Sequence, residues 1–203
     1  FQRFYETVAG FRAPQLWIPG NHDIVSNMIE AVGRDNPCLE KVFRLNQWLI
    51  IMLDTSVRGE VHGYLAPDEL VFLDHQLKAS GNQQLHVLIC MHHNPMPVQA
   101  RWLQNHSLKN EAEFFAVIDR YEHVKCVLWG HIHQDYDEVR KDVRMLASPS
   151  TCIQFHPDND EFTLDDVNPG YRWLELKPGG DFKTGVERVT GRTFDIDFSS
   201  RGY

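Results

Sequence analysis

Three short clusters of histidine and other metal-binding side chains stand out in this sequence. Residues 20–23 read Gly-Asn-His-Asp, His92 and His93 are adjacent, and residues 130–133 read Gly-His-Ile-His. Imidazole nitrogen and amide oxygen both bind divalent cations, and a free histidine also exchanges protons near neutral pH. This mixture of donors suits iron, manganese or zinc better than calcium. The clusters therefore predict a metal site with a nearby acid or base.

Each cluster follows a short apolar run that is typical of a buried strand. The runs cover residues 16–18, 85–91 and 124–129. In open α/β sheets the carboxyl ends of parallel strands meet along one edge, where ligands bind in a crevice. We therefore expect the three clusters to share one site, although a single histidine at a strand end is usually a hydrogen-bonded surface residue.

The spacing within the clusters indicates which side chains face the site. Side chains two residues apart in an extended segment point the same way. His131 and His133 are therefore predicted to face one metal centre while Ile132 packs on the other side. The same alternation sends His92 and His93 to opposite sides, so one of these two is expected to be a ligand.

The remaining chemistry-bearing residues are assigned by their context. Asn21 offers a neutral amide oxygen as a ligand, and His22 can act as an acid or base. Gly130 is expected to let the backbone come close to the metal. Cys90 and Cys126 lie in apolar runs and are predicted to be buried small hydrophobes. Solvated or core roles are expected for the other histidines, namely His62, His75, His86, His106, His123 and His156.

Other patterns predict the elements that position this site. A strand is expected over residues 48–53, one helix begins at Pro67, another follows Asn110, and the first residues recur at helical spacing. No linker divides the chain, which predicts one α/β domain over residues 1–203. Beyond residue 129 only short strands are predicted, over residues 144–147, 151–155, 171–176 and 186–189.

Composition limits the class of protein. With 42% hydrophobic and 24% charged residues the chain has enough apolar sequence for a core, which excludes disorder and coiled coil. Its apolar runs are far shorter than the ~20 residues of a membrane-spanning helix, and it shows no secretion signal or paired cysteine spacing. We expect a cytoplasmic protein without a membrane partner. The formal net charge of −8 disfavours nucleic acid as a partner, so an anionic substrate would need local positive charge.

The clusters also resemble a known family. In order and spacing, residues 20–23, the isolated His92 and residues 130–133 are similar to the last three motifs of the calcineurin-like metallophosphoesterases. The likeness covers essentially the whole chain. Further segments look like the bacterial class III 3′,5′-cyclic AMP phosphodiesterases, namely residues 91–95, Trp102, Leu103, His106, Asn110, and residues 130–134 and 149–155.

This resemblance implies a four-layer α/β/β/α sandwich with a dinuclear metal site at the strand ends. Carried over by motif, Asn21, His92 and His131 would bind one metal, and His133 would bind the other. The cofactors would be two divalent ions, Fe²⁺ or Mn²⁺ with Zn²⁺ as the alternative. Their charge would make a positive pocket in an acidic protein.

The resemblance further implies the hydrolysis of a small cyclic nucleotide, 3′,5′-cyclic AMP, to 5′-AMP. Asn21, His22 and His133 would adjoin the substrate phosphate. A hydroxide that bridges the two metals would attack phosphorus in line, and His22 would protonate the leaving oxygen. Asp23 would orient the side chain of His22 without contacting the substrate itself.

One departure from the family concerns the start of the chain. The family opens with an Asp-x-His motif and a Gly-Asp motif, and neither occurs before Gly20. These motifs supply the remaining ligands of one metal and the carboxylate that bridges both. The chain is therefore expected to be an N-terminally truncated family domain, which leaves the activity of the fragment alone open.

Three alternatives stay open from the sequence. The substrate could be another phosphodiester, such as a 2′,3′-cyclic nucleotide or a glycerophosphodiester, or the chain could be a non-catalytic metal-binding fragment. Substrate choice is expected in residues 98–110 and 148–155, where Trp102 either stacks on a base or packs in the core. The strands after Ser148 either pair across a homodimer or close a second sheet.

Overall fold

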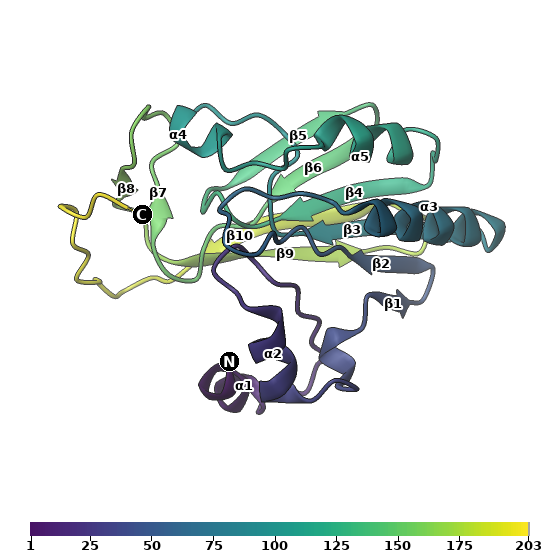
Figure 1. Cartoon of the computed structure of the whole chain (residues 1–203), viewed down its shortest axis with the longest axis horizontal. Coiled ribbons are helices and arrows are strands. Elements are labelled where there is room, and N and C mark those ends of the chain that lie inside the picture. The colour runs from purple at the N-terminus through teal and green to yellow at the C-terminus, as the bar shows by residue number, and fades with distance from the viewer. Residues whose placement is uncertain (203) are drawn as a thin grey trace.

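A six-stranded mixed sheet forms the centre of the computed structural model, which describes residues 1–202 (Figure 1). The strands are β1 (Val42–Leu45), β2 (Trp48–Met52), β3 (His86–Met91), β4 (Val124–Trp129), β5 (Tyr136–Arg140) and β6 (Val143–Ala147). Their order is β1-β2-β3-β4-β6-β5. The four inner strands run parallel, and the edge strands β1 and β5 pair antiparallel with their neighbours.

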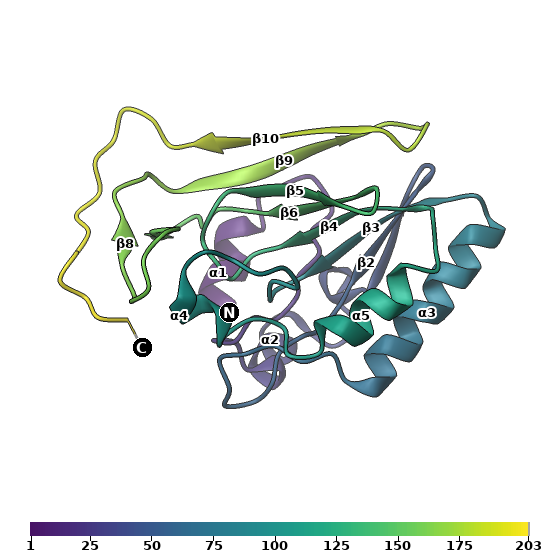
Figure 2. The same cartoon turned by 90° about the horizontal axis from the view of Figure 1, so that it is seen from above.

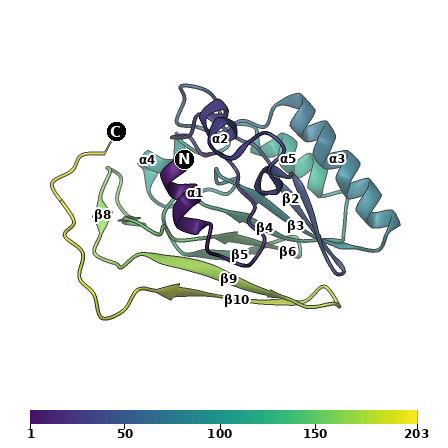
Figure 3. The same ribbon diagram turned by 90° about the horizontal axis from the view of Figure 1, so that it is seen from below.

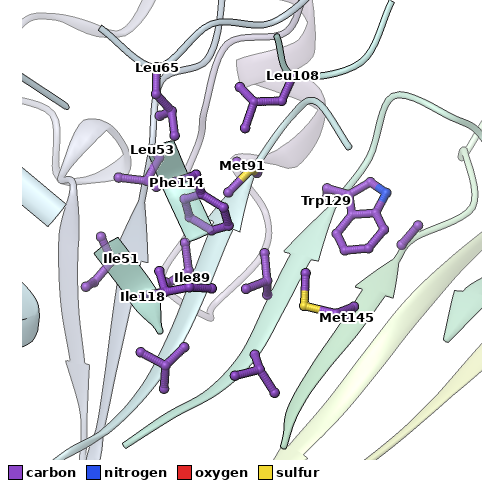
Figure 4. Packing of buried hydrophobic residues seen from close by; sticks show 14 of the residues in the cluster. Ile51, Leu53, Leu65, Ile89, Met91, Leu108, Phe114, Ile118, Trp129 and Met145 are labelled. Carbon is purple, nitrogen blue, oxygen red and sulfur yellow. The ribbon is translucent and has the colours of Figure 1, made fainter. Parts of the chain in front are cut away.

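Helices α3 (Pro67–Asn82) and α5 (Glu111–Ile118) cover one face of this sheet (Figure 2). Pro67 lies in the first turn of α3, where a missing N–H is tolerated, and Asp68 and Glu69 favour the positive end of the helix dipole. Both helices pack onto the inner strands in one large core, which Figure 4 shows in part and which includes Leu73, Leu77, Phe114, Ile118, Ile51, Ile89 and Met91. This core fixes β3 and β4, whose carboxyl ends carry two of the three clusters.

A two-stranded hairpin covers the opposite face of the sheet. Its strands are β9 (Gly170–Leu176) and β10 (Phe182–Arg188) (Figure 2). Leu174, Leu176 and Phe182 pack against a second cluster that contains Trp48, and the Trp48 indole N–H donates to the Lys177 carbonyl at 2.7 Å. The layers are thus helix, sheet and sheet, which confirms the predicted α/β class. Within residues 1–202 no helix covers the outer side of the hairpin.

The remaining elements are short. Helices α1 (Gln2–Val8) and α2 (Val25–Val32) lie side by side near the N-terminus (Figures 1 and 3). The chain also forms a 3₁₀ turn (Pro37–Leu39), α4 (Arg101–Gln104), β7 (Gln154–Phe155) and β8 (Leu164–Asp165). Among residues 1–202, no helix is long and apolar enough to cross a bilayer. All four cysteines are free. Cys126 is fully buried as expected, whereas Cys90 is only half-buried.

Two strand predictions were wrong. Residues 16–18 form no strand, because no described strand pairs with them, although the Trp17 N–H donates to the Cys38 carbonyl at 2.7 Å. The strand predicted over residues 151–155 shrinks to the two residues of β7. Sequence reasoning also missed β1, β5 and α2. These elements lack clear signals, because α2 begins without a capping side chain and β5 is mostly exposed.

Candidate metal centre

The loops that follow β3 and β4 leave the sheet at the same level. Met91 and Trp129 are paired at the ends of these parallel strands, and the Gly130 N–H donates to the His92 carbonyl at 3.2 Å. The backbone register therefore places the second and third clusters next to each other, as predicted. The first cluster joins them through a side chain, because Asn21 Oδ1 lies 2.9 Å from His92 Nε2.

Three donor atoms converge on one point. Asn21 Oδ1 lies 2.9 Å from His92 Nε2 and 3.2 Å from His131 Nδ1, and the two ring nitrogens are 3.2 Å apart. Ligands that each lie about 2.1 Å from a metal at right angles to one another are separated by about 3.0 Å. The triangle therefore has the size of one face of a metal coordination shell.

Hydrogen bonds alone do not satisfy this triangle. The amide oxygen accepts only, and each neutral imidazole nitrogen either donates or accepts. If both ring nitrogens carried protons, the contact between them would set one donor against another. If only one did, its single proton would leave at least one pair of atoms facing lone pair to lone pair. A cation at the centre would satisfy all three atoms at once, so Asn21, His92 and His131 fit a metal ion.

The electrostatics of the site keep these histidines neutral. Burial lowers the pKa of His92 to about 3, and the repulsion that His93, His133 and His22 would exert when protonated lowers it further. Burial likewise lowers the pKa of His131 to about 2, and His92 is the next contributor. A histidine must be neutral to bind a metal. Both rings are therefore ready to act as ligands at neutral pH.

His93 lies close to this group but has a different environment. Candidate donor atoms of His92, His93 and His131 all lie within 4.8 Å of one another. However, His93 Nδ1 is 2.7 Å from the Thr55 hydroxyl and Nε2 is 3.1 Å from the Val61 carbonyl. Because the carbonyl can only accept, Nε2 carries the proton and Nδ1 accepts from the hydroxyl. Both nitrogens are engaged, so His93 has a structural role: its hydrogen bonds connect the end of β3 to residues 55–61.

The third cluster is not extended, which corrects the prediction from side-chain alternation. His131 and His133 have positive φ angles of 58° and 50°. The Ile132 N–H donates to the Gly130 carbonyl at 2.6 Å, which closes a γ-turn around His131. Ile132 is nonetheless fully buried, so it packs away from the site as expected. The turn, rather than a strand, gives the two histidines their directions.

His133 lies beside the triangle rather than in it. Its ring stacks on Phe155 with centroids 4.2 Å apart and planes 7° from parallel, and its buried Nδ1 has no hydrogen-bond partner among the described residues. Burial lowers the pKa of His133 to about 4, and the repulsion that His22 would exert when protonated acts in the same direction. The structure thus brings His133 within electrostatic reach of His22 and His92, with a nitrogen available to another ligand.

The first cluster forms a tight turn. Asp23 Oδ2 accepts from the Gly20 N–H at 2.8 Å, and the Asp23 N–H donates to the Gly20 carbonyl at 3.1 Å. The carboxylate of Asp23 therefore fixes the loop that carries Asn21 and His22. His22 is exposed and lines a cavity of about 650 Å³ together with Asn21 and Asp23. This position gives His22 access to a ligand in the cavity.

Sequence reasoning missed two residues that line this cavity. Asp54 and Arg58 belong to its lining and come from the loop after β2. The available signal was the change from the apolar run over residues 48–53 to a polar loop, the same pattern that marked the three clusters.

The sequence left the role of Trp102 open. Trp102 packs in an aromatic group with Phe155 and Phe162, at centroid distances of 5.0 and 5.1 Å. This arrangement favours the core role for Trp102.

Comparisons with known proteins agree with this geometry. Residues 1–135 match the family described as calcineurin-like phosphoesterase. The whole chain is 40% identical to the 3′,5′-cyclic adenosine monophosphate phosphodiesterase CpdA of Pseudomonas aeruginosa and 42% identical to the protein of that name from Escherichia coli, and it covers 74% of each. Among solved structures, a dimetal phosphatase from Danio rerio has a TM-score of 0.53 at 15% identity, over 79% of this chain and 67% of that one. The last likeness supports the fold.

Proposed function

The chain belongs to the calcineurin-like phosphoesterase family, whose members are hydrolytic, and on this basis we propose that it hydrolyses 3′,5′-cyclic AMP to 5′-AMP. The observation that carries the proposal is the convergence of Asn21, His92 and His131 beside the cavity that His22 lines. The names of the relatives support the cyclic nucleotide as the substrate. A cytoplasmic location is part of the same proposal.

Each residue has one task in this proposal. Asn21, His92 and His131 would hold one divalent cation, and His133 would contribute to a second. Divalent cations bound there would act as Lewis acids on the phosphate and make hydroxide available near neutral pH. Iron or manganese is proposed, with zinc as the alternative, because nitrogen and oxygen donors suit all three.

His22 is proposed to supply the proton for the leaving group. Hydrolysis adds a water oxygen to phosphorus and breaks the bond from phosphorus to the 3′ oxygen, which must gain a proton. His22 is exposed to the cavity, whereas His93 and His131 are buried, so His22 can reach the ligand. Asp23 would act by holding the loop through the Gly20 N–H rather than by contact with the substrate.

Two alternatives keep the same site. Another phosphodiester would use the same metal donors, and the core position of Trp102 leaves the base without the stacking partner considered from the sequence. A non-catalytic metal-binding role is favoured by a different observation, because no carboxylate joins the histidine group within residues 1–202.

The test is hydrolysis by this chain with excess manganese or ferrous iron, followed by chromatography of the products. We expect metal-dependent formation of 5′-AMP from 3′,5′-cyclic AMP that disappears with a chelator. Faster hydrolysis of a 2′,3′-cyclic nucleotide or a glycerophosphodiester would transfer the proposal to that substrate. Tight metal binding without any turnover would support the non-catalytic alternative.

A further inference from the structure

The cavity beside His22 has a second wall that no part of the proposed mechanism uses. Residues 21–26 form one side, and Asp54 with residues 56–59 forms the other. Its volume of about 650 Å³ lies within the range of small-molecule sites, which is about 300–1,000 Å³. The candidate acid and this second wall therefore face the same ligand space.

Hydrogen bonds of Asp54 and Thr55 hold the loop that forms the second wall. Asp54 Oδ1 accepts from the Ser56 N–H at 2.8 Å and from the Ser56 hydroxyl at 2.6 Å. The next residue, Thr55, is bonded to the buried His93, which directly follows His92 in the chain. The loop is thus tied to the same strand end that carries the metal-binding candidate.

Arg58 is the one lysine or arginine among the residues that line this cavity. Its side chain is exposed, and within residues 1–202 its guanidinium makes no hydrogen bond or ion pair. The two carboxylates in the lining are engaged elsewhere, Asp23 with the Gly20 N–H and Asp54 with Ser56. Arg58 therefore carries a positive charge without an ion-pair partner among residues 1–202, in the lining that also contains His22.

We propose that Arg58 binds the phosphate of the nucleotide in this cavity and sets the preference for phosphorylated over uncharged ligands. The inference rests on the proposed function, because it names a further residue of the same site. A guanidinium donates two parallel hydrogen bonds to phosphate oxygens, which an ammonium group cannot do. Arg58 would also bind the product, because 5′-AMP carries more negative charge than the cyclic diester.

Binding measurements on the full chain test the role of Arg58 without requiring turnover. Arg58→Gln, Arg58→Lys and the control Arg192→Gln, an exposed arginine outside this cavity, are titrated with 5′-AMP, adenosine and inorganic phosphate in the presence of manganese. A hydrogen bond to a charged group corresponds to about a tenfold to hundredfold change in affinity. We expect that loss for 5′-AMP and phosphate in Arg58→Gln, partial retention in Arg58→Lys, and wild-type values in Arg192→Gln.

The outcomes separate the two proposals. The role of Arg58 would be overturned if Arg58→Gln kept its phosphate affinity, or if it lost as much affinity for adenosine as for phosphate. Failure of the unsubstituted chain to bind phosphate would overturn it as well. If that chain binds phosphate in an Arg58-dependent manner but does not bind 5′-AMP, the role of Arg58 stands and the cyclic nucleotide assignment falls. Because Arg58 is exposed, thermal unfolding of the variants is expected to match that of the unsubstituted chain.

Discussion

Substitution of Gly20 by alanine is expected to displace a proposed metal ligand. A Cβ atom at Gly20 would lie 2.7 Å from Cε1, 2.8 Å from Nε2 and 2.9 Å from Nδ1 of His92. Gly20 does not have a positive φ angle, so alanine would cause no backbone strain of its own. The effect of Gly20→Ala is therefore steric and directed at the imidazole ring that faces Asn21.

The size of the effect follows from these contacts. Carbon atoms pack at about 3.5–4.0 Å, so the His92 ring or the loop must move by roughly 0.8 Å to relieve the overlap. The distance from His92 Nε2 to Asn21 Oδ1 is 2.9 Å, so a displacement of the His92 ring by roughly 0.8 Å would separate these two donor atoms and open the triangle. Disturbing the groups that orient a metal ligand typically lowers affinity by about 10-fold to 100-fold. We expect a loss of manganese affinity in that range.

The assay is calorimetric titration of manganese into Gly20→Ala, with circular dichroism to establish that the variant is folded. Gly130→Ala is the matched control, because a Cβ there would meet His92 Nδ1 at an ordinary 3.8 Å. It should bind manganese like the unsubstituted chain, although the sequence suggested that Gly130 permits a close approach. Equal losses in the two variants, or no loss in Gly20→Ala, would refute the steric argument.

Further predictions concern four other side chains. His22→Ala should keep its metal content by elemental analysis but lose most turnover, since its proposed task is proton transfer, and metal loss would show that assignment to be wrong. His131→Ala should lower both the metal content and the turnover, and an unchanged metal content would show that His131 is not a ligand. Burial lowers the pKa of His93 from 6.5 to about 4, so the unfolded chain binds more protons between these values and stability falls as the pH drops through this range. Urea unfolding of His93→Gln should therefore show a shallower pH dependence than the unsubstituted chain. Trp102→Ala should lower the free energy of unfolding by about 3 kcal/mol without changing nucleotide affinity, and the reverse pattern would indicate base stacking.

Elements with strong local signals were predictable from the sequence. The helix that begins at Pro67 was confirmed because proline favours the first turn and its leucines recur on one face. The strands β2, β3 and β4 were confirmed because a parallel strand buried on both faces reads as a continuous apolar run. The proximity of His92 and His131 followed from these strands, since the ends of β3 and β4 share one edge of the sheet, whereas Asn21 comes from a loop that no strand precedes.

Features that depend on tertiary context were not predictable. A strand exists only with a partner, and the apolar run over residues 16–18 has none among the described residues. Alternation predicted that only one of His92 and His93 is a ligand, and the family resemblance pointed to His92. Only the structure shows that Thr55 and Val61 engage both nitrogens of His93. Arg58 escaped notice because an exposed arginine in a loop has no sequence pattern of its own.

The turn at His131 and His133 shows how the fold prepares the site. Positive φ angles at residues other than glycine each cost about 1–3 kcal/mol and persist only where the surrounding structure enforces them. Here the buried Ile132 and the stack of His133 on Phe155 provide that enforcement. The same packing holds His131 in the donor triangle, and a bound cation would relieve the unsatisfied lone pairs of that triangle. Cation binding should therefore raise the thermal stability of the chain, and Phe155→Ala should weaken that gain by releasing the ring of His133.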